Sequence, residues 1–159
     1  MRVVFLNPYV GMNGGVKVVA IYAQALQRRG HEVLVVSLPP PSRSLKERLR
    51  GWMAGKFASP ARLMSHFDGK GLNHKILDVN RPIADSDIPD ADAVVATWWE
   101  TAEWLEAMSA RKGRKFYLVQ GHEVFPNLPL ERVRATYRAP LKKVVVSHWL
   151  QSIMAKEYD

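Results

Sequence analysis

Two adjacent glycines follow the first apolar run of the sequence. Gly14 and Gly15 stand between Val3–Leu6, which has strand character, and a helical pattern that runs to Arg29. Glycines ahead of a helix let a ligand approach the backbone, and the amides at a helix N-terminus favour negative charge. We therefore predict that Gly14, Gly15 and Val16 face a phosphate. The alternative is that the glycines only make a tight turn.

Two common phosphate-binding patterns do not fit this loop. A dinucleotide site needs G-x-G-x-x-G and an acidic residue near the end of the second strand, where this chain has Ser37. A P-loop needs a lysine directly after its last glycine, whereas Val16 separates Gly15 from Lys17. The sequence therefore disfavours NAD, FAD and P-loop ATPase functions.

Aromatic and polar side chains follow two later apolar runs. Trp98 and Trp99 come after the fourth run, and an aromatic face can stack on a sugar ring, with core packing as the alternative. Gln120 ends the fifth run, and His122 and Glu123 follow it. Loops that follow strands often carry function, so these residues are candidates for a ligand site.

Strand-like and helix-like segments alternate along the chain, which predicts an α/β fold. The expected strands are rich in Val, Ile, Leu and Tyr, as in strands buried on both faces: Val3–Leu6, Val33–Ser37, Lys75–Val79, Ala93–Thr97, Phe116–Gln120 and Lys143–Ser147. The expected helices are Gly15–Arg29, Ser44–Lys56, Trp98–Arg111, Leu130–Arg138 and His148–Tyr158. This alternation predicts a doubly wound, Rossmann-like, mostly parallel sheet with helices on both faces and a helical insertion around 42–71.

The composition narrows the class of protein. The 159 residues are 47% hydrophobic and include no cysteine, which suits one domain without disulfides or thiolate metal sites. His31 and His74 lack metal-ligand spacing, so we expect no protein-bound metal. The sequence has neither a membrane-spanning apolar run nor a signal-peptide pattern, so we expect a cytoplasmic protein.

A formal charge of +8 favours anionic partners, with solubility as the alternative. Basic residues concentrate between 43 and 62, where apolar residues recur at helical spacing: Leu45, Leu49, Trp52 and Met53. A basic amphipathic helix can lie on an anionic membrane, which predicts a peripheral position at the inner membrane face; an ordinary surface helix is the alternative. No nucleic-acid motif accompanies the charge, so we expect no nucleic-acid partner.

Three blocks of the chain resemble the retaining GT-B glycosyltransferases of family four. The first runs from Gly14-Gly15-Val16 to Gly30-His31-Glu32-Val33, and the others are Phe116–Glu123 and Val144–Gln151. Their order and spacing match the opening, fifth-strand loop and late strand-to-helix step of that family's N-terminal domain. The resemblance implies one half of a GT-B fold, which holds the acceptor and faces a C-terminal donor domain absent from this chain.

The resemblance also implies an activity and a set of site residues. It implies transfer of a hexose or deoxyhexose from a nucleotide-sugar co-substrate to a glycan or lipid-linked acceptor, with retention, in polysaccharide biosynthesis of the cell envelope. No tightly bound cofactor is implied, and the isolated domain should be inactive. The implied sugar-contacting, catalytic position is His122 or Gln120. The implied acceptor-side residues are Asn13, Trp98, Trp99 and Glu123. The alternative function is a non-enzymatic, flavodoxin-like binding module for an anionic ligand or partner.

Overall fold

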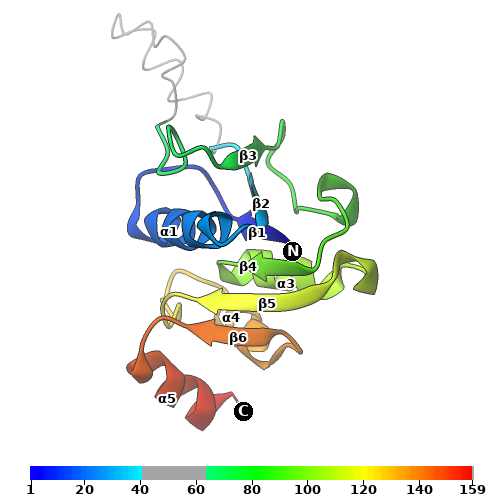
Figure 1. Ribbon diagram of the computed structural model, residues 1–159. Coiled ribbons are helices and arrows are strands. Elements are labelled where there is room, and N and C mark those ends of the chain that lie inside the picture. The colour runs from blue at the N-terminus through cyan, green and yellow to red at the C-terminus, as the bar shows by residue number, and fades with distance from the viewer. Residues whose placement is uncertain (41–63, 159) are drawn as a thin grey trace, which may run out of the picture.

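Among the described residues, six strands form one parallel sheet in the order β3-β2-β1-β4-β5-β6. The computed structural model describes residues 1–40 and 64–158 (Figure 1). Phe5 stands opposite Val35 in β2 and Val95 in β4. The strands are β1 (Arg2–Asn7), β2 (Glu32–Ser37), β3 (Asn73–Ile76), β4 (Ala93–Ala96), β5 (Arg114–Val119) and β6 (Lys142–Val145). This strand order reverses direction between β1 and β4, which confirms the doubly wound, Rossmann-like fold.

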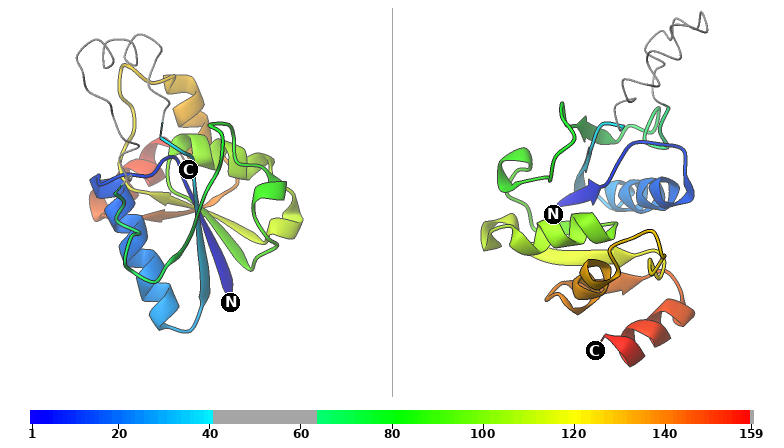
Figure 2. Two further views of the ribbon diagram at one scale, coloured as in Figure 1. Left: turned by 90° about the horizontal axis from the view of Figure 1, so that it is seen from above. Right: turned by 180° about the vertical axis from the view of Figure 1, so that it is seen from behind.

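Helices cover both faces of the sheet, as the alternating sequence predicts. The helix α1 lies on one face, whereas α3 and α4 lie on the other (Figure 2). The α-helices are α1 (Gly14–Arg28), α3 (Trp99–Ala107), α4 (Leu130–Arg138) and α5 (His148–Glu157), and two short 3-10 turns are η1 (Asp85–Asp87) and η2 (Ala110–Lys112).

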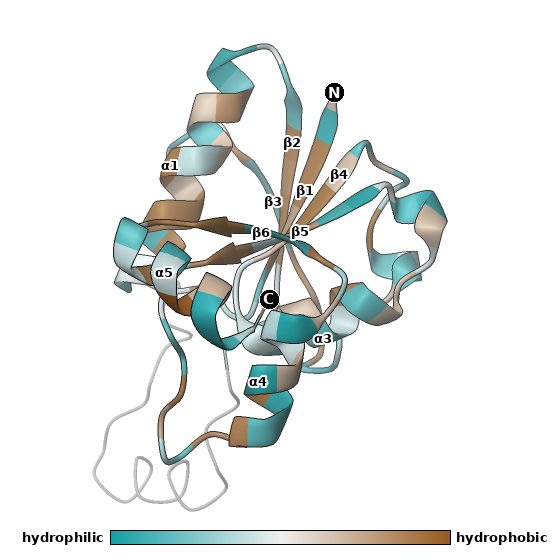
Figure 3. Cartoon of the chain, turned by 90° about the horizontal axis from the view of Figure 1, so that it is seen from below, coloured by the Kyte–Doolittle hydropathy of each residue, from teal (hydrophilic) through white to brown (hydrophobic). Residues whose placement is uncertain are grey.

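The hydrophobic core consists of two clusters, one on each face of the sheet. In the smaller cluster, α1 packs against the residues of β1 and β2 that face it, including Phe5 and Val35. The larger cluster packs α3, α4 and part of α5 against the opposite face, with Leu6, Val94 and Tyr117 at its centre. Figure 3 shows the strands as a hydrophobic layer between helices that are hydrophilic on their outer sides.

Local sequence accounts for both ends of α1. Asn13 is the N-cap, and its side-chain Oδ1 accepts a hydrogen bond from the Val16 amide at 3.0 Å. Val16, Val19, Ala20 and Ala23 form the buried stripe. The helix ends at Arg28, and Gly30, two residues beyond, takes φ of +82°, a conformation that favours glycine.

Most predicted elements differ from the structure by one or two residues at an end, but two of them end three or four residues earlier than predicted. The predicted helix to Arg111 ends instead at Ala107, because Met108 turns into the core and the Ser109 amide donates to the Asp85 carboxylate. The predicted strand Lys75–Val79 begins two residues earlier and ends three residues earlier, at Asn73–Ile76. It is a short edge strand, and its bounds follow from its pairing with β2 rather than from its own apolar residues.

Part of the predicted insertion lies outside the described residues. The predicted helix Ser44–Lys56 and the possible membrane-contacting range 43–62 fall within 41–63, which the structure does not describe. The end of the insertion, from residue 64, forms turns that bury Phe67 against the α1 cluster. Among the described helices, none is long and apolar enough to cross a membrane.

Candidate functional site

A pocket of about 220 Å³ opens where the chain leaves β1, β4 and β5. This is the point where the strand order reverses, and ligands of doubly wound sheets bind there. The lining residues come from the β1–α1 loop, the end of β4 and the β5–α4 loop: Asn7, Pro8, Tyr9, Asn13, Gly15, Val16, Thr97, Trp98, Gln120, Gly121, Glu123 and Phe125.

Gln120 presents an unpaired acceptor in this pocket. Its Nε2 donates to the carbonyl oxygen of Thr97 at 3.3 Å, whereas its Oε1 is buried and accepts no hydrogen bond. A Cβ atom added to Gly15 would lie 3.6 Å from that Oε1. Buried polar atoms nearly always have partners, so this oxygen is an exception among the described side chains, as is the Nε1 of Trp99.

Glu123 is the acidic residue of the pocket, and it is only 3% exposed. Its Oε2 accepts hydrogen bonds from the Trp99 amide at 3.2 Å and from the Tyr117 hydroxyl at 3.3 Å. Burial raises the pKa of Glu123 to about 8, although both hydrogen bonds act to lower it. The carboxyl group is therefore mostly protonated at neutral pH. Both hydrogen bonds are accepted by Oε2.

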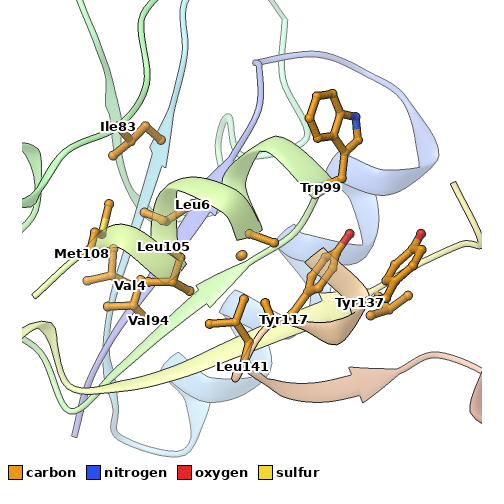
Figure 4. Packing of buried hydrophobic residues seen from close by; sticks show 14 of the residues in the cluster. Val4, Leu6, Ile83, Val94, Trp99, Leu105, Met108, Tyr117, Tyr137 and Leu141 are labelled. Carbon is orange, nitrogen blue, oxygen red and sulfur yellow. The ribbon is translucent and has the colours of Figure 1, made fainter. Parts of the chain in front are cut away.

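Two stacked tyrosines hold the loop that carries Glu123. The rings of Tyr117 and Tyr137 lie 5.9 Å apart and nearly parallel, and Figure 4 shows their hydroxyls pointing the same way. The Tyr137 hydroxyl accepts from the Glu123 amide at 2.8 Å and donates to the Gly121 carbonyl at 3.3 Å. Strand β5 and helix α4 thus position the loop through buried hydrogen bonds.

The N-terminus of α1 forms another wall of the pocket. Gly14 and Gly15 begin the helix, and neither has a positive φ, so a left-handed turn is not the reason for them. A Cβ atom on Gly14 would meet nothing within 4 Å. Since Asn13 accepts from the Val16 amide, the first helical amides left for a ligand are those of Gly14 and Gly15.

The structure separates the predicted site residues into two groups. Gly15, Val16, Asn13, Trp98, Gln120 and Glu123 line the pocket together, and Gly14 adjoins it in the same helix turn. Trp99 instead packs in the core at 4% exposure, beneath the Arg132 guanidinium, which lies 5.0 Å from its ring centre. This assigns core packing, the alternative expected for one tryptophan, to Trp99.

His122 lies outside this pocket. Its Nε2 is within 2.8 Å of the Tyr158 hydroxyl, and its ring lies against Tyr137 and Tyr158. Of the two residues between which the sequence left the sugar-contacting position open, only Gln120 lines the pocket. A catalytic role for His122 stays a prediction that the pocket geometry does not support.

Sequence reasoning missed several residues of the pocket. Asn7, Thr97, Tyr9 and Phe125 line it, and each follows or ends a strand at its carboxyl end. Their position in the chain was therefore a usable signal, but their residue types were not. Neither lysine nor arginine lines the pocket, and in the described ranges no group of three metal-ligating side chains could hold a metal ion.

Comparisons with known proteins were made for the whole chain. No family model, curated protein or solved structure matches it.

Proposed function

We propose that this chain is the acceptor-side domain of a glycosyltransferase. It acts with a second, donor-binding domain to move a hexose or deoxyhexose from a nucleotide-sugar to a glycan or lipid-linked acceptor, with retention. The observation that carries the proposal is the convergence of the glycine loop, Trp98, Gln120 and Glu123 on one pocket at the switch point of the sheet.

The pocket chemistry suits a sugar hydroxyl better than a free anion. The unpaired Oε1 of Gln120 accepts from a hydroxyl, and the protonated carboxyl of Glu123 donates to one. The half-buried Trp98 offers apolar surface to the sugar ring. The described residues that line this pocket include no lysine or arginine, so among them a diphosphate would meet the α1 N-terminus, and the second domain would supply further groups.

Exposed apolar side chains around the same edge of the sheet support a partner over the pocket. Five of them follow the carboxyl ends of β1, β5 and β6: Tyr9 at 41% exposure, Met12 at 56%, Phe125 at 50%, Val146 at 42% and Trp149 at 62%. Exposed apolar surface of this kind marks interaction sites. A donor-binding domain would cover this rim and exclude water from the transferred sugar.

Sugar transfer by the natural gene product that contains these residues tests the proposal. The protein is incubated with radiolabelled UDP-glucose, GDP-mannose or dTDP-rhamnose and a lipid and glycan extract, and the label incorporated is measured. We expect transfer from one donor, reduced about tenfold or more by Gln120→Ala because a sugar hydroxyl loses its acceptor. Tyr22→Ala, an exposed substitution on α1 outside the pocket, should transfer at the unchanged rate.

Two results would contradict the proposal. Unchanged transfer by a folded Gln120→Ala protein would place the sugar elsewhere. Absence of transfer from all three donors, with retained binding of inorganic phosphate or pyrophosphate, would favour the alternative function of an anion-binding module. The open space at Gly14 and the free first amides of α1 are the observations that keep this alternative.

A further inference from the structure

A second pocket, of about 400 Å³, adjoins the first. Pro8 and Tyr9 line both pockets, so the two lie side by side along the β1–α1 loop. The other walls come from the ends of β2, α3 and α4 and from the segment after β3: Leu38, Pro39, Asn80, Arg81, Pro82, Glu100, Trp104 and Arg132.

Both arginines of this second pocket are paired with carboxylates. Arg81 donates to both oxygens of Asp87, at 2.6 Å each. Arg132 donates to both oxygens of Glu103, at 3.0 and 2.5 Å. Glu100 adds a further carboxyl that forms no ion pair with a described residue. The pocket therefore has no excess positive charge, in contrast to the whole chain, and does not select an anion.

The same ion pairs hold planar polar groups in fixed positions. A guanidinium has five N–H donors, so Arg81 and Arg132 keep donors beyond those used on Asp87 and Glu103. Glu100 supplies carboxyl oxygens that can accept hydrogen bonds. Trp104 and the 41% exposed Tyr9 add aromatic surface. Fixed donors, an acceptor and aromatic rings together match a neutral polyol with an apolar ring face.

We infer that the second pocket binds a neutral saccharide unit of the acceptor, with Tyr9 and Trp104 against its ring and Glu100, Arg81 and Arg132 bonded to its hydroxyls. This inference rests on the proposed function, because the first pocket would hold the transferred sugar and Tyr9 would lie between the two. Binding of a saccharide by the chain itself can nevertheless be measured without transfer.

Nuclear magnetic resonance of the nitrogen-15-labelled chain tests the inference. The indole signal of Trp104 is assigned with Trp104→Phe, and the methyl α-glycosides of glucose, mannose, rhamnose and N-acetylglucosamine are titrated in turn. We expect at least one glycoside to shift the Trp104 signal, with an affinity about tenfold weaker in Glu100→Gln because the ligand loses an ionic hydrogen-bond partner. Glu106→Gln, an exposed substitution on the same helix outside the pocket, should bind with unchanged affinity.

The outcomes separate this inference from the proposed function. No shift of the Trp104 signal with any glycoside, or equal affinity in a folded Glu100→Gln chain, overturns the saccharide site. If either result is found while transfer by the gene product is lost in Gln120→Ala, the transferase proposal stands without the saccharide site. Glycoside binding at Trp104 without any transfer activity leaves the saccharide site supported and removes the transferase.

Discussion

Gly15 and Gln120 approach each other so closely that a Cβ atom on Gly15 would lie 3.6 Å from Oε1 and 3.8 Å from Nε2 of the Gln120 side chain. This contact joins the first turn of α1 to the end of β5 at the switch point of the sheet. A methyl group on Gly15 would make ordinary van der Waals contact with the Gln120 amide, so the two residues form neighbouring parts of the pocket wall.

Alanine substitutions should distinguish the two glycines of the loop. Gly14→Ala places its methyl group in open space within a helix, so we expect the free energy of unfolding to rise by up to about 1 kcal/mol. Gly15→Ala places its Cβ atom 3.3 Å from Asn13 Oδ1, which crowds the N-cap and should offset that gain. Urea unfolding of both variants measures the difference, and equal stabilisation would contradict the close contact.

The protonated state of Glu123 predicts a pH dependence of stability. The pKa of Glu123 is about 8 in the folded chain and near 4.5 without burial, so the folded state binds more protons between those values. Stability should therefore fall as pH rises from about 5 to about 8, by at most about 1.4 kcal/mol per pH unit from this group. Below the lower pKa and above the upper one, the group adds no slope.

Glu123→Gln should remove this contribution, because its amide does not titrate. Urea unfolding of both proteins across that pH range measures the difference between their slopes, which cancels the effect of other titrating groups. Parallel stability curves for the two proteins would show that Glu123 is ionised at neutral pH.

The buried hydroxyl of Tyr137 should contribute more to the free energy of unfolding than an exposed tyrosine hydroxyl does. Tyr137→Phe leaves the Glu123 amide and the Gly121 carbonyl without this partner, so we expect a loss of about 1–3 kcal/mol. Tyr22→Phe, whose tyrosine is 40% exposed on α1, should change stability by less than about 0.5 kcal/mol. Urea unfolding compares the two, and similar losses would exclude a special role for Tyr137.

Of two glycines with positive φ, Gly113 should tolerate substitution by alanine less well than Gly69. It has φ of +87°, and a Cβ atom there would lie 2.2 Å from the Ala91 carbonyl oxygen. Gly69 has φ of +68° but open space around that position. We expect Gly69→Ala to lose about 1 kcal/mol from backbone strain and Gly113→Ala to lose several kcal/mol or fail to fold. Thermal unfolding ranks the two variants, and the opposite order would contradict the contact.

The fold was predictable because its signals are local in the sequence. Apolar runs and helical spacing predicted the alternation of elements. Asn13 just before α1 and Gly30 just after it are local signals for the two ends of that helix. Edge strand β3 was placed inaccurately, because none of its four residues is buried and pairing with β2 decides its bounds. The helix before Gly113 was predicted too long, since the contact between Asp85 and Ser109 is distant in sequence.

By itself, the sequence determined the α/β fold, the glycine loop and the strand ends at which site residues gather. Only the tertiary structure decided which neighbouring side chains enter the pocket: Trp98 rather than Trp99, and Gln120 rather than His122. The chain leaves β5 at Val119, so strand alternation no longer predicts side-chain direction there. The protonation of Glu123 depends on burial, which arises when Tyr117, Trp99 and the loop pack around its carboxyl group.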